Sequence, residues 1–254
     1  MSGHSKWSSI KHKKAKIDAK KGRIFSRLSK EIILAAKLGG ADVEANPRLR
    51  TAVNAARNVN MPSDNIERAI KKGAGQLEGQ VMEEFTYEAY APGGIGVIID
   101  CLTDNRNRSA ADIRHLLTRG NAKLANSGAV SMLFHRKARF LVEGEKAQED
   151  ALMELFFNAG VDIDDIHMDE GSAEIIAPPE AFDAVVKVLE GAGIVPTESG
   201  VARIPQTTVP VADVKTAQHV ISLLESLEEY DDVQNVYANA AILDDVVKQL
   251  AAEK

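Results

Sequence analysis

The spacing of apolar residues changes from a helical period to a strand period partway along the chain, and this change constrains the fold most strongly. Between residues 22 and 72, apolar side chains recur every three or four positions, as in amphipathic helices packed on a shared core. A glycine-rich stretch at residues 73–79 follows, and residues 84–90 then alternate with period two. The sequence therefore predicts a helical unit, a linker and a region that contains β-sheet.

Three helices are expected in the first unit. The first spans residues 22–38, and Gly39-Gly40 ends it. The second begins with Asn46 as its cap and Pro47 in its first turn, where the missing N–H of proline costs nothing. The third spans residues 63–72. Three short amphipathic helices can bury one small core, so this unit is predicted to be an all-helical domain.

Strands and short helices alternate after the linker. Residues 84–119 read as two strands and a helix, and residues 131–205 as strands and helices in the order of a split βαβ fold. The helix at 213–228 and the strand at 233–238 cannot bury their faces alone. We therefore expect an α+β fold, in which the all-helical N-terminal domain is followed by two ferredoxin-like α+β domains, one inserted in the other. The expected parts are a basic arm at 1–21, a helical domain at 22–79, a discontinuous α+β domain at 80–130 and 206–254, and an inserted α+β domain at 131–205. Three consecutive units are the alternative.

Charge is divided unevenly between the parts. The first thirty residues hold ten Lys or Arg and one acidic residue, whereas the whole chain has a net charge of −6. A basic segment on an acidic body is typical of a protein that meets a polyanion. We expect nucleic acid as the partner of the basic part and a protein partner for the acidic domains.

The basic arm is rich in lysine, whose ammonium group contacts phosphates as a point charge and reads no base. The residues predicted to contact nucleic acid are Lys6, Lys11, His12, Lys13, Lys14, Lys16, Lys20, Lys21, Arg23, Arg27, Lys30 and Lys37. A solvated charged surface is one alternative. A membrane-surface arm is another, but few apolar side chains in the arm could insert, so no membrane contact is expected.

A second segment could also contact nucleic acid. Asn105, Arg106, Asn107 and Arg108 follow a predicted buried strand and precede a helix, whose N-terminus favours anions. Asn105 and Asn107 are equally good turn or cap residues, so a capping role is the alternative.

Catalytic and metal-binding patterns are not found in the sequence. Cys101 lies in an apolar stretch and reads as a buried core thiol, and the six histidines show no ligand spacing. We therefore expect no catalytic residue, metal, cofactor or small-molecule substrate, and a protein that is not an enzyme. No stretch of about 18 apolar residues occurs, and the N-terminus lacks the apolar region of a secretory signal. The expected location is the cytoplasm of a bacterium, or the mitochondrial matrix in a eukaryote.

Several segments together resemble the YebC family. They are Gly3-His4-Ser5-Lys6-Trp7, Gly22-Arg23-Ile24-Phe25, Asn46-Pro47-Arg48-Leu49-Arg50, Tyr90-Ala91-Pro92-Gly93-Gly94 and Asp104-Asn105-Arg106-Asn107-Arg108. The resemblance covers essentially the whole chain. It implies a helical N-terminal domain and two α+β domains, and it adds no catalytic residue.

The function implied by the resemblance is that of a probable DNA-binding transcriptional regulatory protein. The family also includes the mitochondrial translational activator of cytochrome c oxidase, so a ribosome- or RNA-associated translation factor is the alternative. An enzyme that acts on nucleic acid is a third hypothesis, which the separation of acidic from basic residues disfavours.

Overall fold

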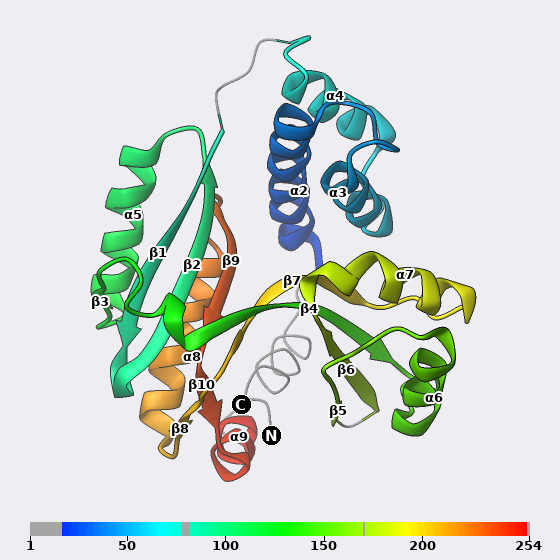
Figure 1. The fold of residues 1–254 in the computed structure, drawn as a ribbon. Helices are drawn as coiled ribbons and strands as arrows, with labels where there is room; N and C mark the ends of the chain where they lie inside the picture. Colours follow the sequence, from blue (N-terminus) through cyan, green and yellow to red (C-terminus); the bar gives the residue numbers. More distant parts are fainter. Residues whose placement is uncertain (1–16, 78–81, 170, 253–254) are drawn as a thin grey trace.

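The computed structural model describes residues 17–77, 82–169 and 171–252, which form three modules (Figure 1). The first module is helical, as predicted, and consists of α2 (Ile17–Gly39), α3 (Pro47–Asn58) and α4 (Ser63–Gly73). Its helices share one core, in which Ile32 and Leu49 are fully buried. Asn46 caps α3 by accepting a hydrogen bond from the backbone N–H of Leu49, as its position before Pro47 predicts. Helix α2 begins at Ile17, inside the segment that was predicted to be part of the arm.

The second module contains a four-stranded antiparallel sheet with two helices on one face. Its strands lie in the order β3-β1-β2-β9. Side chains of α5 and α8 pack on the sheet in one hydrophobic core, and the central strand β2 is buried along most of its length. The elements are β1 (Glu83–Ala91), β2 (Ile95–Thr103), α5 (Arg106–Arg119), β3 (Lys123–Leu124), α8 (Val214–Glu228) and β9 (Val233–Ala238).

The third module has the βαββαβ order of a ferredoxin-like fold. Its sheet has the order β5-β6-β4-β7, and all three neighbouring pairs are antiparallel. Helices α6 and α7 share a core with the sheet. The elements are β4 (Phe134–Glu143), α6 (Glu149–Ala159), β5 (Asp165–Asp169), β6 (Ser172–Ala177), α7 (Phe182–Gly191) and β7 (Glu198–Pro205).

The second module reaches a similar arrangement by a different chain order. Its strand β1, which lies between β3 and β2, comes first in the chain, whereas the equivalent strand β6 of the third module comes third. Strand β9 belongs to the same sheet as β1 although the third module lies between them in the sequence. On this basis we propose that residues 80–130 and 206–254 form one discontinuous domain and residues 131–205 an inserted one.

Short elements complete the fold. The strands β8 (Val209–Val211) and β10 (Ala240–Ile242) pair in parallel, and α9 (Asp244–Ala252) follows them. Short 3₁₀ turns lie at Pro92–Gly94, Ser131–Leu133 and Pro179–Ala181. Within the described ranges, none of the helices has the length and apolar character needed to cross a membrane.

Candidate nucleic-acid interface

The structure describes only part of the predicted basic arm. Lys6, Lys11, His12, Lys13, Lys14 and Lys16 lie outside the described residues. Lys20 and Lys21 belong to the first turns of α2. Lys37 lies in the last turn of α2 and is exposed, where its charge also complements the negative end of the helix dipole.

Three of the predicted cations on α2 contact the segment that joins α8 to β9. The Arg23 guanidinium lies 3.4 Å from a carboxylate oxygen of Glu229. Arg27 donates a hydrogen bond to the backbone carbonyl of Glu228. Carbonyls at the end of a helix carry partial negative charge, so this end of α8 favours cations. The helical module is thereby attached to the second module along one side of α2.

Lys30 makes the most buried of these contacts. Its ammonium donates to Oδ1 of Asp232 at 2.7 Å and to the carbonyl of Asp231 at 2.9 Å. The side chains of Lys30 and Asp232 are only 15% and 5% exposed. This pair is therefore shielded from solvent and belongs to the interior of the protein, not to a free cationic surface.

Asp232 is the centre of a hydrogen-bond cluster. Its Oδ2 accepts from Ser109 Oγ at 2.6 Å, from Thr103 Oγ1 at 2.8 Å and from Arg108 Nη2 at 2.8 Å. The Tyr230 hydroxyl lies 3.2 Å from the same oxygen and donates to Asp112 at 2.7 Å. A buried carboxylate with this many donors is fully satisfied, and it fixes the positions of the side chains around it.

The pKa values in this cluster follow from the same contacts. Burial alone raises the pKa of Asp232, but the hydrogen bonds from Arg108, Lys30, Ser109 and Thr103 outweigh burial and hold this pKa well below its usual range. Burial and the hydrogen bond with Asp112 raise the pKa of Tyr230 to about 12. The cluster therefore keeps an ionised carboxylate and a neutral tyrosine near neutral pH.

The second predicted contact segment is used largely within the chain. Asn105 caps α5 by accepting from the backbone N–H of Arg108 at 3.1 Å. Arg108 binds Asp104 and Asp232. Arg106 lies over the ring of Phe85, with its guanidinium carbon 5.6 Å from the ring centroid. Asn107 is exposed. The capping alternative thus holds for Asn105, and Arg108 is bound by two carboxylates although its side chain is partly exposed.

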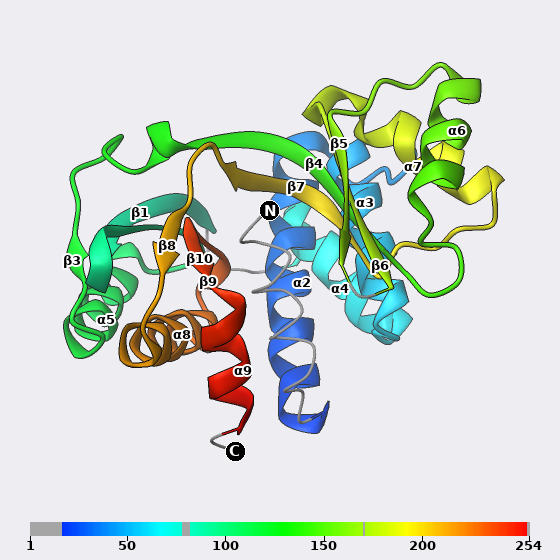
Figure 2. The ribbon, with the colours of Figure 1, turned by 90° about the horizontal axis from the view of Figure 1, so that it is seen from below.

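The structure brings the two predicted surfaces to one carboxylate. Lys30 and Arg108 bind opposite oxygens of Asp232. Seen from below, α2 runs between the other two modules (Figure 2). Sequence reasoning missed Asp232, because an aspartate after a helix carries no local sign of partners that lie far away in the sequence.

No catalytic constellation emerges from these contacts. Cys101 is 2% exposed, and burial together with the nearby Asp100 raises its pKa to about 12, so its thiol stays neutral. Within residues 17–77, 82–169 and 171–252, no group of three or more His, Cys, Asp or Glu side chains is arranged to hold a metal ion.

Comparison with known families matches nearly the whole chain. The model described as the N-terminal domain of the TACO1/YebC protein matches residues 5–76. The model described as the TACO1/YebC second and third domain matches residues 82–240.

Individual relatives agree with these matches. A probable transcriptional regulatory protein of Desulfotalea psychrophila is 47% identical over 99% of this chain and 100% of its own length. Another of Desulfatibacillum aliphaticivorans is 49% identical over 97% of this chain and 99% of its own length. The crystal structure of a conserved hypothetical protein from Aquifex aeolicus is 47% identical and superimposes with a TM-score of 0.85, over 92% of this chain and 96% of that one.

Proposed function

Because the chain belongs to the TACO1/YebC family, we propose that it is a DNA-binding transcriptional regulatory protein that acts without catalysis. Relatives that match along nearly their whole length are named as probable transcriptional regulatory proteins. The observation that supports this function best is the charge of the N-terminal segment, with ten Lys or Arg and one acidic residue in the first thirty. A segment of this composition binds phosphates and releases their counterions.

The phosphate contacts are assigned mainly to the arm. Arg23, Arg27 and Lys30 already bind groups of the α8–β9 segment, so their charge is largely used within the protein. We propose that Lys6, Lys11, His12, Lys13, Lys14, Lys16, Lys20 and Lys21 carry most of the affinity, with Lys37 beside them. Arg106 and Asn107 supply the second contact.

The acidic modules have a separate role in this proposal. Residues after Lys72 carry a net charge of −17, from 14 basic and 31 acidic residues, and would be repelled by a polyanion. We propose that they meet a protein partner, in the bacterial cytoplasm where the nucleic acid lies. No membrane contact and no small-molecule substrate belong to this function.

Titration against defined DNA duplexes tests the proposal. The protein is titrated into labelled duplexes of candidate promoter sequence and of shuffled sequence, at physiological salt. A regulator of transcription is expected to keep an affinity advantage for at least one promoter sequence. Equal affinity for every duplex would refute the transcriptional part of the proposal.

A translation factor is the second candidate function, and the position of α2 favours it. Helix α2 lies against the second module through Arg27 and Lys30, two of the cations predicted to contact nucleic acid, instead of standing free to enter a major groove. Sedimentation of a cell extract separates the two functions. Co-migration with ribosomal particles at physiological salt would favour the translation factor, and migration with free protein would exclude it.

A further inference from the structure

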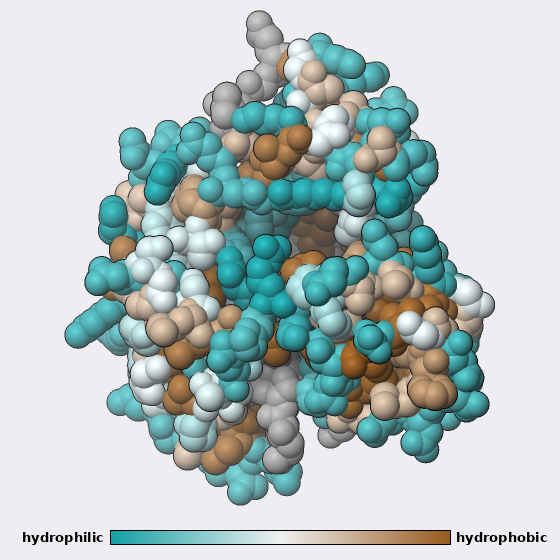
Figure 3. Space-filling view, viewed as in Figure 1, coloured by the Kyte–Doolittle hydropathy of each residue, from teal (hydrophilic) through white to brown (hydrophobic). Residues whose placement is uncertain are grey.

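A cleft lies where the three modules meet. It has a volume of about 840 Å³ and is lined by residues of α3 in the helical module, β7 and α7 in the third module, and β9 in the second. The space-filling view shows the face hollowed between the modules (Figure 3). Sites for small ligands commonly have volumes of about 300–1,000 Å³, so this cleft is large enough for one or a few nucleotides.

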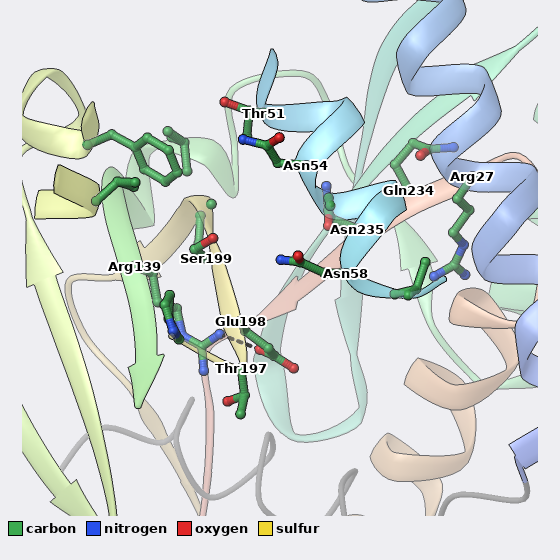
Figure 4. A pocket seen from close by; sticks show the side chains of 18 of the residues that line it. Arg27, Thr51, Asn54, Asn58, Arg139, Thr197, Glu198, Ser199, Gln234 and Asn235 are labelled. Carbon is green, nitrogen blue, oxygen red and sulfur yellow. Dashed lines mark hydrogen bonds and ion pairs between the residues drawn. The ribbon is translucent and has the colours of Figure 1, made fainter. Parts of the chain in front are cut away.

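Side-chain amides from two modules line the cleft. Asn54 and Asn58 are one helical turn apart on α3, and Asn235 projects from β9 on the same side (Figure 4). All three are exposed to solvent. Among the residues that the structure describes, none of their side chains has a hydrogen-bond partner. Three amides thus face a shared space with their donors and acceptors free.

Two buried donors at the edge of the cleft also lack partners. Nε of Arg27 and Nε2 of Gln234 are both inaccessible to solvent and make no hydrogen bond within the described chain. Both residues line the cleft. A buried donor without an acceptor is destabilising, and the wall of the cleft therefore holds two polar groups that the described chain leaves unsatisfied.

The charges that line the cleft balance. Four arginines and four carboxylates are present, and Arg139 and Glu198 bind each other at 2.8 Å. The arginines are Arg27, Arg50, Arg57 and Arg139, and the carboxylates are Asp183, Glu190, Glu198 and Glu228. A phosphate site would have an excess of positive charge, so the cleft suits a neutral polar group better than a phosphate.

Nucleobase edges are neutral groups of this kind. An asparagine or glutamine amide offers a donor and an acceptor side by side, which matches the paired donor and acceptor of a base edge. Bases in a duplex present these edges inside a groove, which a concave cleft cannot enter. Unpaired bases can swing out and reach such a cleft.

We propose that the cleft between α3, β7 and β9 binds unpaired nucleotides of a polynucleotide, with Asn54, Asn58 and Asn235 reading base edges. The inference deepens the proposed function and rests on it, because the arm supplies the phosphate contacts that hold the chain nearby. The unpaired segment can come from DNA or from RNA, since both offer the same base edges.

Fluorescence anisotropy with short labelled oligonucleotides tests the proposal. The probes are a single-stranded DNA, the RNA of the same sequence, and a DNA hairpin whose stem contains that sequence and whose loop is a non-nucleotide linker, so that all of its bases are paired. The variant is Asn58→Ala with Asn235→Ala, and the matched control is Asn126→Ala with Asn158→Ala, two exposed asparagines outside the cleft. Circular dichroism verifies that all proteins are folded.

The cleft variant is expected to bind the single strand more weakly by about fivefold per amide, since one hydrogen bond contributes about 1 kcal/mol. Its affinity for the hairpin should stay within twofold of wild type, and the control should match wild type on every probe. The single-stranded probe that the wild type binds with higher affinity identifies whether the nucleotides come from DNA or from RNA.

Three results would overturn the inference. They are an unchanged affinity of the cleft variant for single strands, an equal loss on the single strand and the hairpin, or a wild type that binds no single-stranded probe. If wild type binds the hairpin but the cleft variant shows no defect, only the cleft proposal fails. If substitution of the arm lysines leaves single-strand binding intact while the cleft variant loses it, the proposed role of the arm is refuted and the proposed role of the cleft is supported.

Discussion

Replacing Asp232 by asparagine tests how the helical module is attached to the rest of the protein. The substitution keeps the shape of the side chain but removes its charge. Lys30 and Arg108 then lose an ionic acceptor, and Ser109 and Thr103 must share a weaker one. We expect Asp232→Asn to lower the free energy of unfolding.

The magnitude follows from the partners. Lys30 is largely buried, so its hydrogen bond to the carboxylate is worth about 1.5–3 kcal/mol. The Arg108 side chain is 47% exposed, so solvent screening reduces its contribution to less than about 1 kcal/mol. Together these losses should lower the free energy of unfolding by about 3 kcal/mol at pH 7. Urea unfolding monitored by circular dichroism measures this change.

The loss should depend on pH in a defined direction. The pKa of Asp232 lies lower in the folded protein than its value of about 3.9 in an unfolded chain. The carboxylate therefore contributes its full stability above about pH 5 and loses it as the pH falls through the folded pKa. The gap between wild type and Asp232→Asn should be widest near pH 7 and narrow below about pH 4.

A double-mutant cycle with Lys30→Met isolates the ion pair. The two substitutions together should cost less than the sum of their separate effects, by about 1–2 kcal/mol. A loss below about 0.5 kcal/mol for Asp232→Asn at pH 7, or a gap that stays constant when the pH is lowered from 7 to about 2.5, would refute the reasoning.

Three further predictions concern the interiors of the helical module and the second module. Gly73→Ala should destabilise the helical module by about 1–3 kcal/mol in thermal unfolding, because the new Cβ would lie 2.3 Å from the carbonyl oxygen of Ile33. An unchanged melting temperature would contradict the close approach of α4 to α2. Glu88→Gln should lower the free energy of unfolding in urea by about 2 kcal/mol, because the buried carboxylate accepts hydrogen bonds from the N–H groups of Gly128, Val130 and Ser131. An unchanged free energy of unfolding would show that Glu88 does not hold this loop in place. Cys101 should resist iodoacetamide at pH 8 until urea unfolds the protein, since burial raises its pKa to about 12, whereas rapid labelling of the native protein would show an exposed thiol.

Local signals in the sequence predicted much of the fold. Asn46 and Pro47 mark the start of α3 by their own chemistry, and the strand at residues 233–238 has the observed bounds of β9. The need of a lone strand to bury its faces led to the prediction that residues 206–254 share a domain with residues 80–130, but it did not identify β2 as the neighbour of β9. Such features depend on residues that are neighbours in the chain or on a simple packing rule.

Other features depend on distant partners and could not be predicted in the same way. The strands β3 and β8 have two and three residues, too short to show a period, and form only because a neighbour pairs with them. The bond between Lys30 and Asp232 joins residues 202 positions apart, and nothing in the sequence around Lys30 indicated that its partner would be Asp232.

The central claim of this account is that lysines of the arm hold phosphates, and the salt dependence of duplex binding tests it most directly. The variant replaces Lys11, Lys13, Lys14 and Lys16 by glutamine, and the control makes the same change at the exposed residues Lys123, Lys187, Lys215 and Lys248. Wild type and control should lose affinity steeply with salt, by about 0.9 logarithmic units per phosphate contact for each tenfold rise in salt. In a plot of log K against log[salt], the slope of the arm variant should be shallower by about 3–4. Equal slopes and equal affinities for all three proteins would contradict the claim.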